Sequence, residues 1–521
     1  MGEGLLKLYR SRVNRESKIA FSGGFFATLL FHFFKFANYL PNHDSVYNYY
    51  SDQNVIGSGR WALSAASAFS SFFDLPWVIG IISAVFIGLS TAVIVKIFKI
   101  KNPVLIVLAA SLLAAAPGTT ETFFFLYTAD AYMIAMFLSA LGAYFLRLDE
   151  HRISRYILGG ACICVVCGIY QAYVSFALVL IALSFVLELF RGNVSTKCAV
   201  WHILKAAVTV AFAMLCYIII WKLSLAIFSR TPTSYQGISE VGTFSASRIV
   251  SAAVGTLSTV LIYFLQWNVL EHGFSLYSVL SLLFFAAFAF AFIAAVIKSR
   301  IYKSRSALIL SVLAVISVLP FSCIWLFFSG AVQYRPMMLH SLVLLFVFVG
   351  VLFEEYTGNV MKNIACLLLC VTALNHALMA NIAYFYMDRS YERTYGEAVL
   401  MMSRINELAD EYDFDRIAVI GNHSIEVSFD SDDPEHWHSS PSGQINILTS
   451  CLEKHLLFDS DHVVNFLKNT FGLELEKVNE EELERISETD HAEDMPCWPS
   501  PSSVSVDDGV LIIKLSQREE A

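Results

Sequence analysis

Acidic residues in the first polar segment of the chain are the first candidates for chemistry. The segment 40–75 carries Asp44 beside His43, and Asp52 follows eight residues later. A carboxylate whose pKa is raised by partial burial can accept a proton from a hydroxyl group. A solvated loop acid is the alternative interpretation, because most loop acids keep ordinary pKa values. We therefore take Asp44 as the first candidate base and Asp52 as the second.

Arg60 and Trp61 follow in the same segment, where Arg60 is the only Lys or Arg. A guanidinium can hold a phosphate through two parallel hydrogen bonds, and an indole ring can stack on a sugar. Both side chains are also typical anchors at a membrane surface. A ligand role and an anchor role therefore stay open for each of them.

Two acids flank a strongly apolar run at 123–126. These are Glu121 and Asp130, and the surrounding composition predicts that they lie at or below a membrane surface. An ionisable group at that depth is costly, so a functional role is the default hypothesis. Capping or surface acids are the alternative.

Further candidate ligands lie where other apolar runs begin or end. Tyr170 and Gln171 fall in a tight turn, where Gln171 can bond a sugar hydroxyl or simply a neighbouring helix. Arg230 and Arg335 can hold a phosphate, and Arg335 can equally extend toward lipid headgroups. These residues complete the set that we expect to bind substrate.

The composition shows which kind of fold must position these side chains. The 521 residues are 56% hydrophobic and only 15% charged, with 42 Phe and a mean hydropathy of +0.60. A soluble globular domain does not have this composition. The expected fold is a membrane all-α bundle, and the charge distribution does not suggest a nucleic-acid partner.

A helix needs roughly 20 apolar residues to cross a membrane. That length predicts eleven spans, with a further apolar segment at 249–266 interpreted as an outer interfacial helix. The predicted spans are 19–39, 76–95, 103–117, 130–146, 156–170, 172–190, 206–228, 275–297, 306–328, 337–353 and 363–386.

The distribution of Lys and Arg predicts the orientation of these spans. Nineteen of these residues fall in the predicted cytoplasmic segments before residue 387, against six elsewhere in that part. Because cytoplasmic loops are enriched in positive charge, we expect a multi-pass protein of the cell membrane with a cytoplasmic N-terminus. Eleven crossings would place residues 387–521 outside the cell.

The chain therefore divides into a membrane domain at 1–386 and an acidic tail at 387–521. The tail contains 30 Asp and Glu but only 10 Lys and Arg. Its pattern predicts a helix over 391–412, a strand over 416–421 and a hairpin turn at 507–509. We expect a small α+β domain.

No metal or cofactor is expected from recognisable motifs, and a divalent cation is not indicated. His436 and His438 lie among acids in the tail, but a solvated loop is the favoured interpretation. Cys451 and Cys497 would share the extracytoplasmic side, and whether they form a disulfide stays open.

Four motifs, taken in order, resemble the Gtr type II glucosyltransferase family. They are Asn-His-Asp at 42–44, Gly-Ser-Gly-Arg-Trp at 57–61, Tyr-Gln-Ala-Tyr at 170–173, and the tail pattern Met-Pro-Cys-Trp-Pro followed by Asp-Gly-Val-Leu-Ile-Ile-Lys-Leu-Ser. The likeness runs from end to end. Each motif alone is short, whereas their order and positions together are specific.

The resemblance implies a GT-C-like enzyme that modifies O-antigen or a related bacterial surface glycan. It implies a polyprenyl-phosphate-sugar donor, such as undecaprenyl-phosphate-glucose, and a glycan acceptor at the outer face. A flippase and a donor synthase would act in the same pathway. In GT-C enzymes the first outer loop holds a catalytic acid, which matches Asp44 here. Reaction by inverting direct displacement needs this one base and cations for the departing phosphate.

Two other functions remain as alternatives. A glycan polymerase or ligase also has many spans, but would favour outer loops richer in basic residues. A membrane transporter could use Glu121, Asp130 and Gln171 to line a path at membrane depth. It would show no cleavage of a lipid-phosphate sugar.

Overall fold

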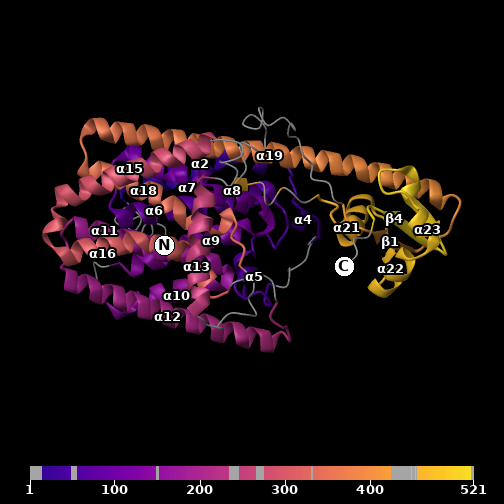
Figure 1. The fold of residues 1–521 in the computed structure, drawn as a ribbon, viewed down its shortest axis with the longest axis horizontal. Helices are drawn as coiled ribbons and strands as arrows, with labels where there is room; N and C mark the ends of the chain where they lie inside the picture. The colour runs from indigo at the N-terminus through magenta and orange to yellow at the C-terminus, as the bar shows by residue number, and fades with distance from the viewer. Residues whose placement is uncertain are drawn as a thin grey trace, which may run out of the picture.

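Long apolar helices lying side by side make up most of the structure, and a small sheet stands at one end (Figure 1). The computed structural model describes residues 14–47, 55–147, 152–233, 246–265, 275–329, 332–423, 447–448, 452 and 455–517. Within these ranges, nine helices are long and apolar enough to cross a membrane. Together with their composition, this identifies a mostly helical membrane protein.

The helices of the first half follow one another with short connections. They are α2 (Arg15–Phe31), α3 (Phe33–Ala37), α4 (His43–Tyr47), α5 (Leu63–Ala66), α6 (Pro76–Phe98), α7 (Pro103–Ala115), α8 (Pro117–Phe124), α9 (Leu126–Phe145), α10 (Ile153–Ile169), the 3-10 turn η1 (Gln171–Tyr173), α11 (Val174–Phe190) and α12 (Thr196–Ile227). Proline stands in the first turn of α6, α7 and α8. Proline suits that position because the first amide groups of a helix have no partner within it.

The second half of the bundle is more interrupted. It contains α13 (Ala246–Leu265), α15 (Leu276–Ser299), η3 (Ile301–Lys303), α16 (Arg305–Ile316), α17 (Val318–Ser322), η4 (Ile324–Phe327), η5 (Pro336–Met338), η6 (His340–Leu342), α18 (Val343–Tyr356) and α19 (Asn359–Ala409). The segment predicted as one span over 306–328 is therefore three pieces. The count of eleven spans remains a prediction.

A polar side chain interrupts the first predicted span, 19–39. His32 stands between α2 and α3, with Nδ1 2.7 Å from the Tyr384 hydroxyl and Nε2 2.9 Å from the Ala114 carbonyl oxygen. Because a buried imidazole requires polar partners, these contacts hold the ring between three helices. Apolar run length alone could not locate this break.

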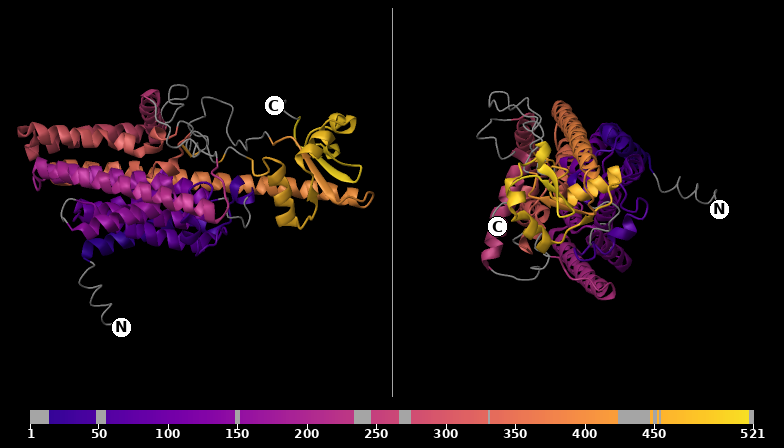
Figure 2. Two further views of the ribbon diagram at one scale, coloured as in Figure 1. Left: turned by 90° about the horizontal axis from the view of Figure 1, so that it is seen from below. Right: turned by 90° about the vertical axis from the view of Figure 1, so that its right-hand side faces the viewer.

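Helix α13 lies crosswise to the long axis of the bundle in Figure 1 and in the left view of Figure 2. Its C-terminal end packs on the start of α15, where the Tyr277 hydroxyl donates to the Tyr263 carbonyl oxygen at 2.7 Å. As a result, α12 ends and α15 begins toward the same end of the bundle. Residues Arg248–Leu265 of α13 are nevertheless one of the nine described helical segments long and apolar enough to cross a membrane, so the interfacial helix over 249–266 stays a prediction.

Charged side chains tie together three helices where α6, α11 and α18 end. Arg191 donates to Glu355 at 2.5 Å, to Glu188 at 3.1 Å and to the Phe98 carbonyl oxygen at 2.6 Å. Lys99 also bonds Glu188 at 2.8 Å. The side chains of Arg191 and Glu188 are only 13% and 8% exposed. Removing Arg191 would therefore leave the buried Glu188 with Lys99 as its remaining cation here and would take from Glu355 its 2.5 Å ion pair.

Arg191→Ala is expected to destabilise the bundle by roughly 3 kcal/mol, the usual cost of breaking a buried ion pair. Thermal unfolding of the purified protein in detergent should then begin several degrees below that of wild type. Lys197→Ala removes an exposed base nearby and serves as the control. Equal unfolding temperatures for Arg191→Ala and wild type would contradict the expectation.

The tail is a four-stranded sheet covered by helices on both faces. The strands are β1 (Arg416–Ile420), β2 (Glu476–Lys477), β3 (Val504–Asp507) and β4 (Val510–Lys514), in the order β2-β1-β4-β3. β1 is parallel to both its neighbours, and β3 and β4 form an antiparallel hairpin. The helices are α21 (Ser460–Phe471), α22 (Glu480–Ser487) and α23 (Asp490–Asp494), with a 3-10 turn η9 at Pro501–Ser503.

Alternation of side chains along the strands creates two cores. Ile417 and Val419 of β1 face a cluster that includes Met401 of α19 and Phe466 of α21. The intervening strand residues face Met495 and its neighbours on the other side. The sequence patterns at 416–421 and 507–509 correctly locate β1 and the turn of the hairpin. Helix α19, which includes most of the predicted 391–412 helix, runs without a break through the proposed boundary at 386–387.

Candidate functional site

Arg60 lies in a stack of aromatic rings near the end of the bundle that faces the sheet. Its guanidinium sits 4.7 Å from the ring centre of Tyr170 and donates to the Tyr132 hydroxyl at 3.2 Å. The two tyrosine rings are themselves stacked, 4.6 Å apart with an interplanar angle of 11°. Residues from the first polar segment, α9 and the turn before α11 are thus joined by one cation.

The segment carrying Arg60 is held by its backbone. Gln171 donates to the Ser58 carbonyl oxygen at 2.8 Å and to the Tyr217 hydroxyl at 2.9 Å. Trp221 donates to the Ile56 carbonyl oxygen at 2.8 Å. Gly59 has a φ of +80°, and a Cβ there would come within 2.6 Å of both Gln171 and Tyr217. Only glycine fits this close approach without displacing the neighbours.

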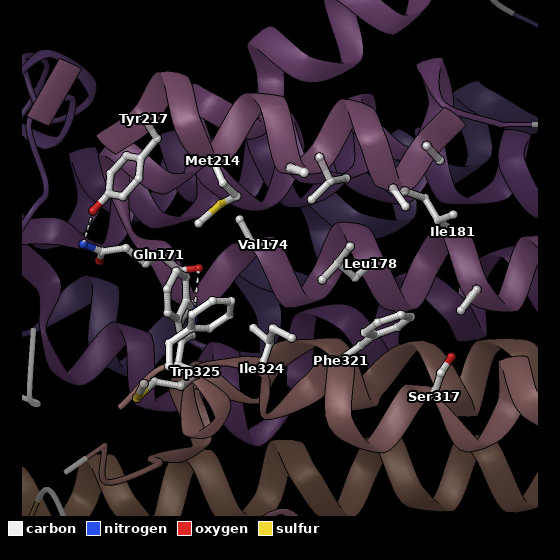
Figure 3. Close-up of a pocket in the computed structure, with 18 of the residues that line it drawn as sticks. Gln171, Val174, Leu178, Ile181, Met214, Tyr217, Ser317, Phe321, Ile324 and Trp325 are labelled. Carbon is white, nitrogen blue, oxygen red and sulfur yellow. Dashed lines mark hydrogen bonds between the residues drawn. The ribbon is translucent and has the colours of Figure 1, made fainter. Parts of the chain in front are cut away.

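A cavity of about 790 Å³ extends from this cluster between α11, α12 and the α16–η4 segment. Arg60, Tyr170 and Gln171 line one end of it. Figure 3 shows Gln171, Tyr217 and Trp325 together at that end, with Ile181 and Ser317 farther along. The remaining lining is almost entirely apolar, including Leu178, Phe185, Ile203, Val210, Met214, Leu310 and Phe321.

The length of the cavity follows from the helix that walls it. The lining residues of α12 run from Ile203 to Trp221, which at the α-helical rise corresponds to roughly 27 Å. A bilayer core is about 30 Å thick. The cavity is thus long and its walls are mostly apolar. Arg60, at one end, is the single charged residue among the described residues that line it.

Trp61 does not line this cavity but packs against α10. Gly168 lies so close to it that an added Cβ would stand 2.5 Å from the indole ring. Its Nε1 is buried, with no hydrogen-bond partner among the described residues. Trp61 therefore helps to seat the segment of Arg60 on the bundle.

Glu121 and Arg335 lie on facing segments. Glu121 is fully buried and accepts a 2.5 Å hydrogen bond from the Met337 amide. Arg335, two residues earlier in the chain, lies 6.0 Å from the ring centre of Phe125. Glu121 thus holds the backbone that carries Arg335. Neither side chain lines the cavity.

Asp130 and Arg230 are also separate from the cavity. Asp130 is fully buried in α9, beyond the first turn of the helix, and one of its oxygens accepts from the Ala131 amide at 2.8 Å. Arg230 is exposed just beyond α12 and is not among the described residues that line the cavity.

Asp44 lies on α4, between the bundle and the tail. Its side chain is 40% exposed, and one oxygen is 3.3 Å from Nε2 of His43. Val46 of the same helix belongs to the core formed by α19 and α21, and the His43 ring lies 6.3 Å from that of His462 on α21. The tail therefore reaches the segment that carries Asp44. Asp52 lies outside the described residues.

Asp74 is the third acid of the 40–75 segment, and sequence reasoning did not single it out. Burial raises the pKa of its carboxyl, while the positive charge of Lys35 and hydrogen bonds from Ser45 and the Tyr127 backbone oppose the rise. Lys35 itself is 1% exposed. The sequence did contain a signal for this pair, because Lys35 is a lone base in the apolar run 19–39 and Asp74 is a lone acid just before the run at 76–95. Their proximity depends on how α3 and α6 pack.

The structure thus brings Arg60, Tyr170 and Gln171 into one place, near the end of the bundle where α4, α5 and α8 also lie (Figure 1). The aromatic partners Tyr132, Tyr217 and Trp325 complete this cluster. Polar aromatic residues at the ends of apolar runs are common interfacial anchors, so their sequence positions alone did not distinguish them.

Comparison with known proteins identifies the family of the chain. A family model described as Glucosyl transferase GtrII matches residues 33–354, which include the first polar segment, the turn at 170–173 and most of the bundle. No curated protein and no solved structure matches the chain. Because the matched range covers more than half of the sequence, the chain belongs to the GtrII family of glucosyl transferases.

Proposed function

We propose that this glycosyltransferase moves a glucosyl or other hexosyl group from a polyprenyl-phosphate sugar to a hydroxyl of a bacterial surface glycan. The reaction would take place at the outer face of the cell membrane. The observation that carries the proposal is an apolar cavity, roughly as long as a bilayer core is thick, with Arg60 at one end.

The cavity suits a lipid-linked donor better than a nucleotide sugar. A prenyl chain buries apolar surface along its whole length, and such burial is favourable in proportion to area. A nucleotide would instead need polar partners for its base, ribose and two phosphates. Arg60 at the mouth can bind one phosphate while the chain occupies the cavity.

The proposed reaction is a single displacement at the anomeric carbon. The acceptor hydroxyl forms the new bond to this carbon as the bond to the phosphate oxygen breaks, which inverts the configuration. Asp44 takes the hydroxyl proton. The electron pair of the broken bond leaves on the lipid phosphate, whose charge Arg60 stabilises, with Arg335 as a further candidate cation.

Candidate sugar contacts come from the other polar residues of this end. Gln171 and Tyr170 would bind the hexose, Trp61 would seat the segment that carries Arg60, and Glu121 and Asp130 would orient the segments around the sugar. The orientation proposed above places α4, the cavity mouth and the tail on the extracytoplasmic side. A flippase and a donor synthase would supply the lipid-linked sugar there. The same proposal includes a GT-C-like bundle of eleven spans, with α13 as the interfacial helix.

The direct test uses the purified full-length protein in nanodiscs with polyprenyl-phosphate-[14C]glucose and a lipid-linked glycan acceptor. Transfer of label with equimolar release of polyprenyl phosphate is expected, and UDP-glucose should not replace the donor. Movement of the donor across the membrane without bond cleavage would instead identify a transporter. Coupling of glycan chains without use of the glucosyl donor would identify a polymerase or ligase.

Filling the cavity should weaken donor binding selectively. Ala211 lines the cavity on α12, so Ala211→Trp displaces part of a bound prenyl chain. We expect KM for the long-chain donor to rise roughly tenfold or more, which corresponds to the loss of about 1.5–3 kcal/mol of apolar burial. A donor analogue with a short chain should be much less affected.

Phe212→Trp is the matched control because the neighbouring Phe212 is 65% exposed on the outer surface of the bundle. Its KM should stay close to that of wild type. Equal effects of the two substitutions, or none with Ala211→Trp, would mean that the donor chain binds elsewhere.

A further inference from the structure

Three side chains from distant parts of the sequence converge within the tail. Glu397 stands on α19, His423 follows β1, and His455 precedes α21. Nε2 of each histidine lies 3.4 Å from the same Glu397 oxygen, Oε2. The two rings are stacked face to face with centres 4.0 Å apart. His423 and His455 are buried, at 5% and 3% exposure.

These separations are long for hydrogen bonds, which usually join heavy atoms 2.7–3.2 Å apart. Glu397 Oε2 and His423 Nε2 are buried, with no hydrogen-bond partner among the described residues. Two ligands that each lie about 2.0–2.1 Å from a tetrahedral zinc ion stand roughly 3.3–3.4 Å from each other. The 3.4 Å contacts from Glu397 to the two histidines match that edge. The two stacked rings must rotate apart for both Nε2 lone pairs to point at one ion, because each lone pair lies in the plane of its ring.

We propose that Glu397, His423 and His455 form a binding site for a divalent transition metal, with zinc as the best match. Two imidazoles and one carboxylate are ordinary zinc ligands, and a fourth position would remain for water or another group. The Glu397 side chain is 31% exposed and so leaves a route of entry. This site is separate from the cavity and does not depend on the proposed glycosyl transfer.

Protonation of His455 must change when the metal binds. Its Nδ1 accepts the Leu457 amide at 3.0 Å, so in the neutral ring the proton lies on Nε2. Metal binding takes the Nε2 lone pair, the ring proton moves to Nδ1, and the Leu457 hydrogen bond is lost. One such bond is small beside the free energy of zinc coordination.

Arg393 lies one helical turn before Glu397, and its positive charge attracts the Glu397 carboxylate. Its positive charge opposes a dication, so coordination by all three side chains is required to hold the metal. Once bound, the metal would join α19 to the segment after β1 and to the approach to α21. Because α21 packs on α4, the metal would also steady the contact between the tail and the segment of Asp44.

The test measures zinc on the full-length protein in detergent after treatment with a chelator, gel filtration and equilibration with buffered Zn²⁺. About one zinc per chain is expected by mass spectrometry of the metal. Glu397→Gln, His423→Asn and His455→Asn should each weaken binding at least tenfold. His491→Gln is the matched control, since His491 lies in the same domain and bonds Ser505 instead.

X-ray absorption of zinc on the wild-type protein provides a measurement that does not depend on whether the variants fold. Nitrogen and oxygen neighbours at about 2.0 Å with imidazole scattering are expected. A sulfur shell would assign the metal to cysteines such as Cys497, and six oxygen neighbours would assign it to surface acids. Either shell, the absence of zinc from wild type, or unchanged binding by all three folded variants would overturn the proposal.

Discussion

Arg60→Ala is expected to lower the rate of glucosyl transfer at least a hundredfold, with a smaller loss in Arg60→Lys. Removing one preorganised donor to a developing anion usually costs 10²–10³ in rate. A lysine keeps the charge but cannot make two parallel hydrogen bonds to a phosphate. The measurement is kcat and KM for the polyprenyl-phosphate donor in nanodiscs, with thermal unfolding as the check on folding.

Arg230→Ala provides the comparison for charge at the same end of the bundle. Arg230 is exposed and does not line the cavity, so its loss should change kcat less than threefold. Arg335→Ala tests the other candidate cation, which lies on the segment held by Glu121. A large loss in Arg335→Ala with an active Arg60→Ala would transfer the phosphate-binding role to Arg335.

Asp44→Asn is expected to lower kcat by roughly 10²–10⁴, the contribution of a positioned general base. The donor KM should change little, because the proton is transferred only in the chemical step. Asn keeps the size of the side chain, so the packing of α4 on α21 should be preserved. Transfer is measured with saturating donor and acceptor.

Asp74→Asn tests whether Asp74 acts as the base or only balances the charge of Lys35. Asp74 is near the buried Lys35, and loss of its charge should lower the unfolding temperature. The double substitution Asp74→Asn with Lys35→Met removes both charges and should recover much of that stability. If the recovered protein is inactive while Asp44→Asn retains activity, Asp74 rather than Asp44 is the base.

Much of the fold could be predicted because it is encoded in short stretches of sequence. Apolar runs predicted helices at 76–95 and 172–190, and the structure has α6 and α11 there. Alternation and a turn signal predicted β1 and the β3–β4 hairpin. The break at His32 could not be predicted, because the partners of its ring lie on other helices. The division of 306–328 had a local signal in Pro320, which cannot donate a helical hydrogen bond to residue 316.

The candidate site follows the same division. Residue type was enough to propose Arg60, Tyr170 and Gln171, and the structure brings them together at one end of the cavity. Type alone could not separate them from Arg230, which is exposed. The three proposed metal ligands could not be predicted either. Glu397, His423 and His455 share no short motif, and only the packing of α21 and β1 on α19 brings them together.

Helix α19 runs unbroken for 51 residues from the bundle into the tail (Figure 1). The number of residues in it therefore sets both the distance of the tail from the bundle and the direction in which the tail faces. Each residue of an α-helix adds about 1.5 Å and turns the chain by about 100°. One inserted residue between 387 and 397 would therefore swing Glu397 and the docking face of α21 away from α4. Seven inserted residues would nearly restore the direction, yet raise the tail by roughly 10 Å. The contact between the tail and α4 thus requires both the present length and the present rotation of this helical segment. Insertions in surface loops of the tail would change neither the length nor the rotation.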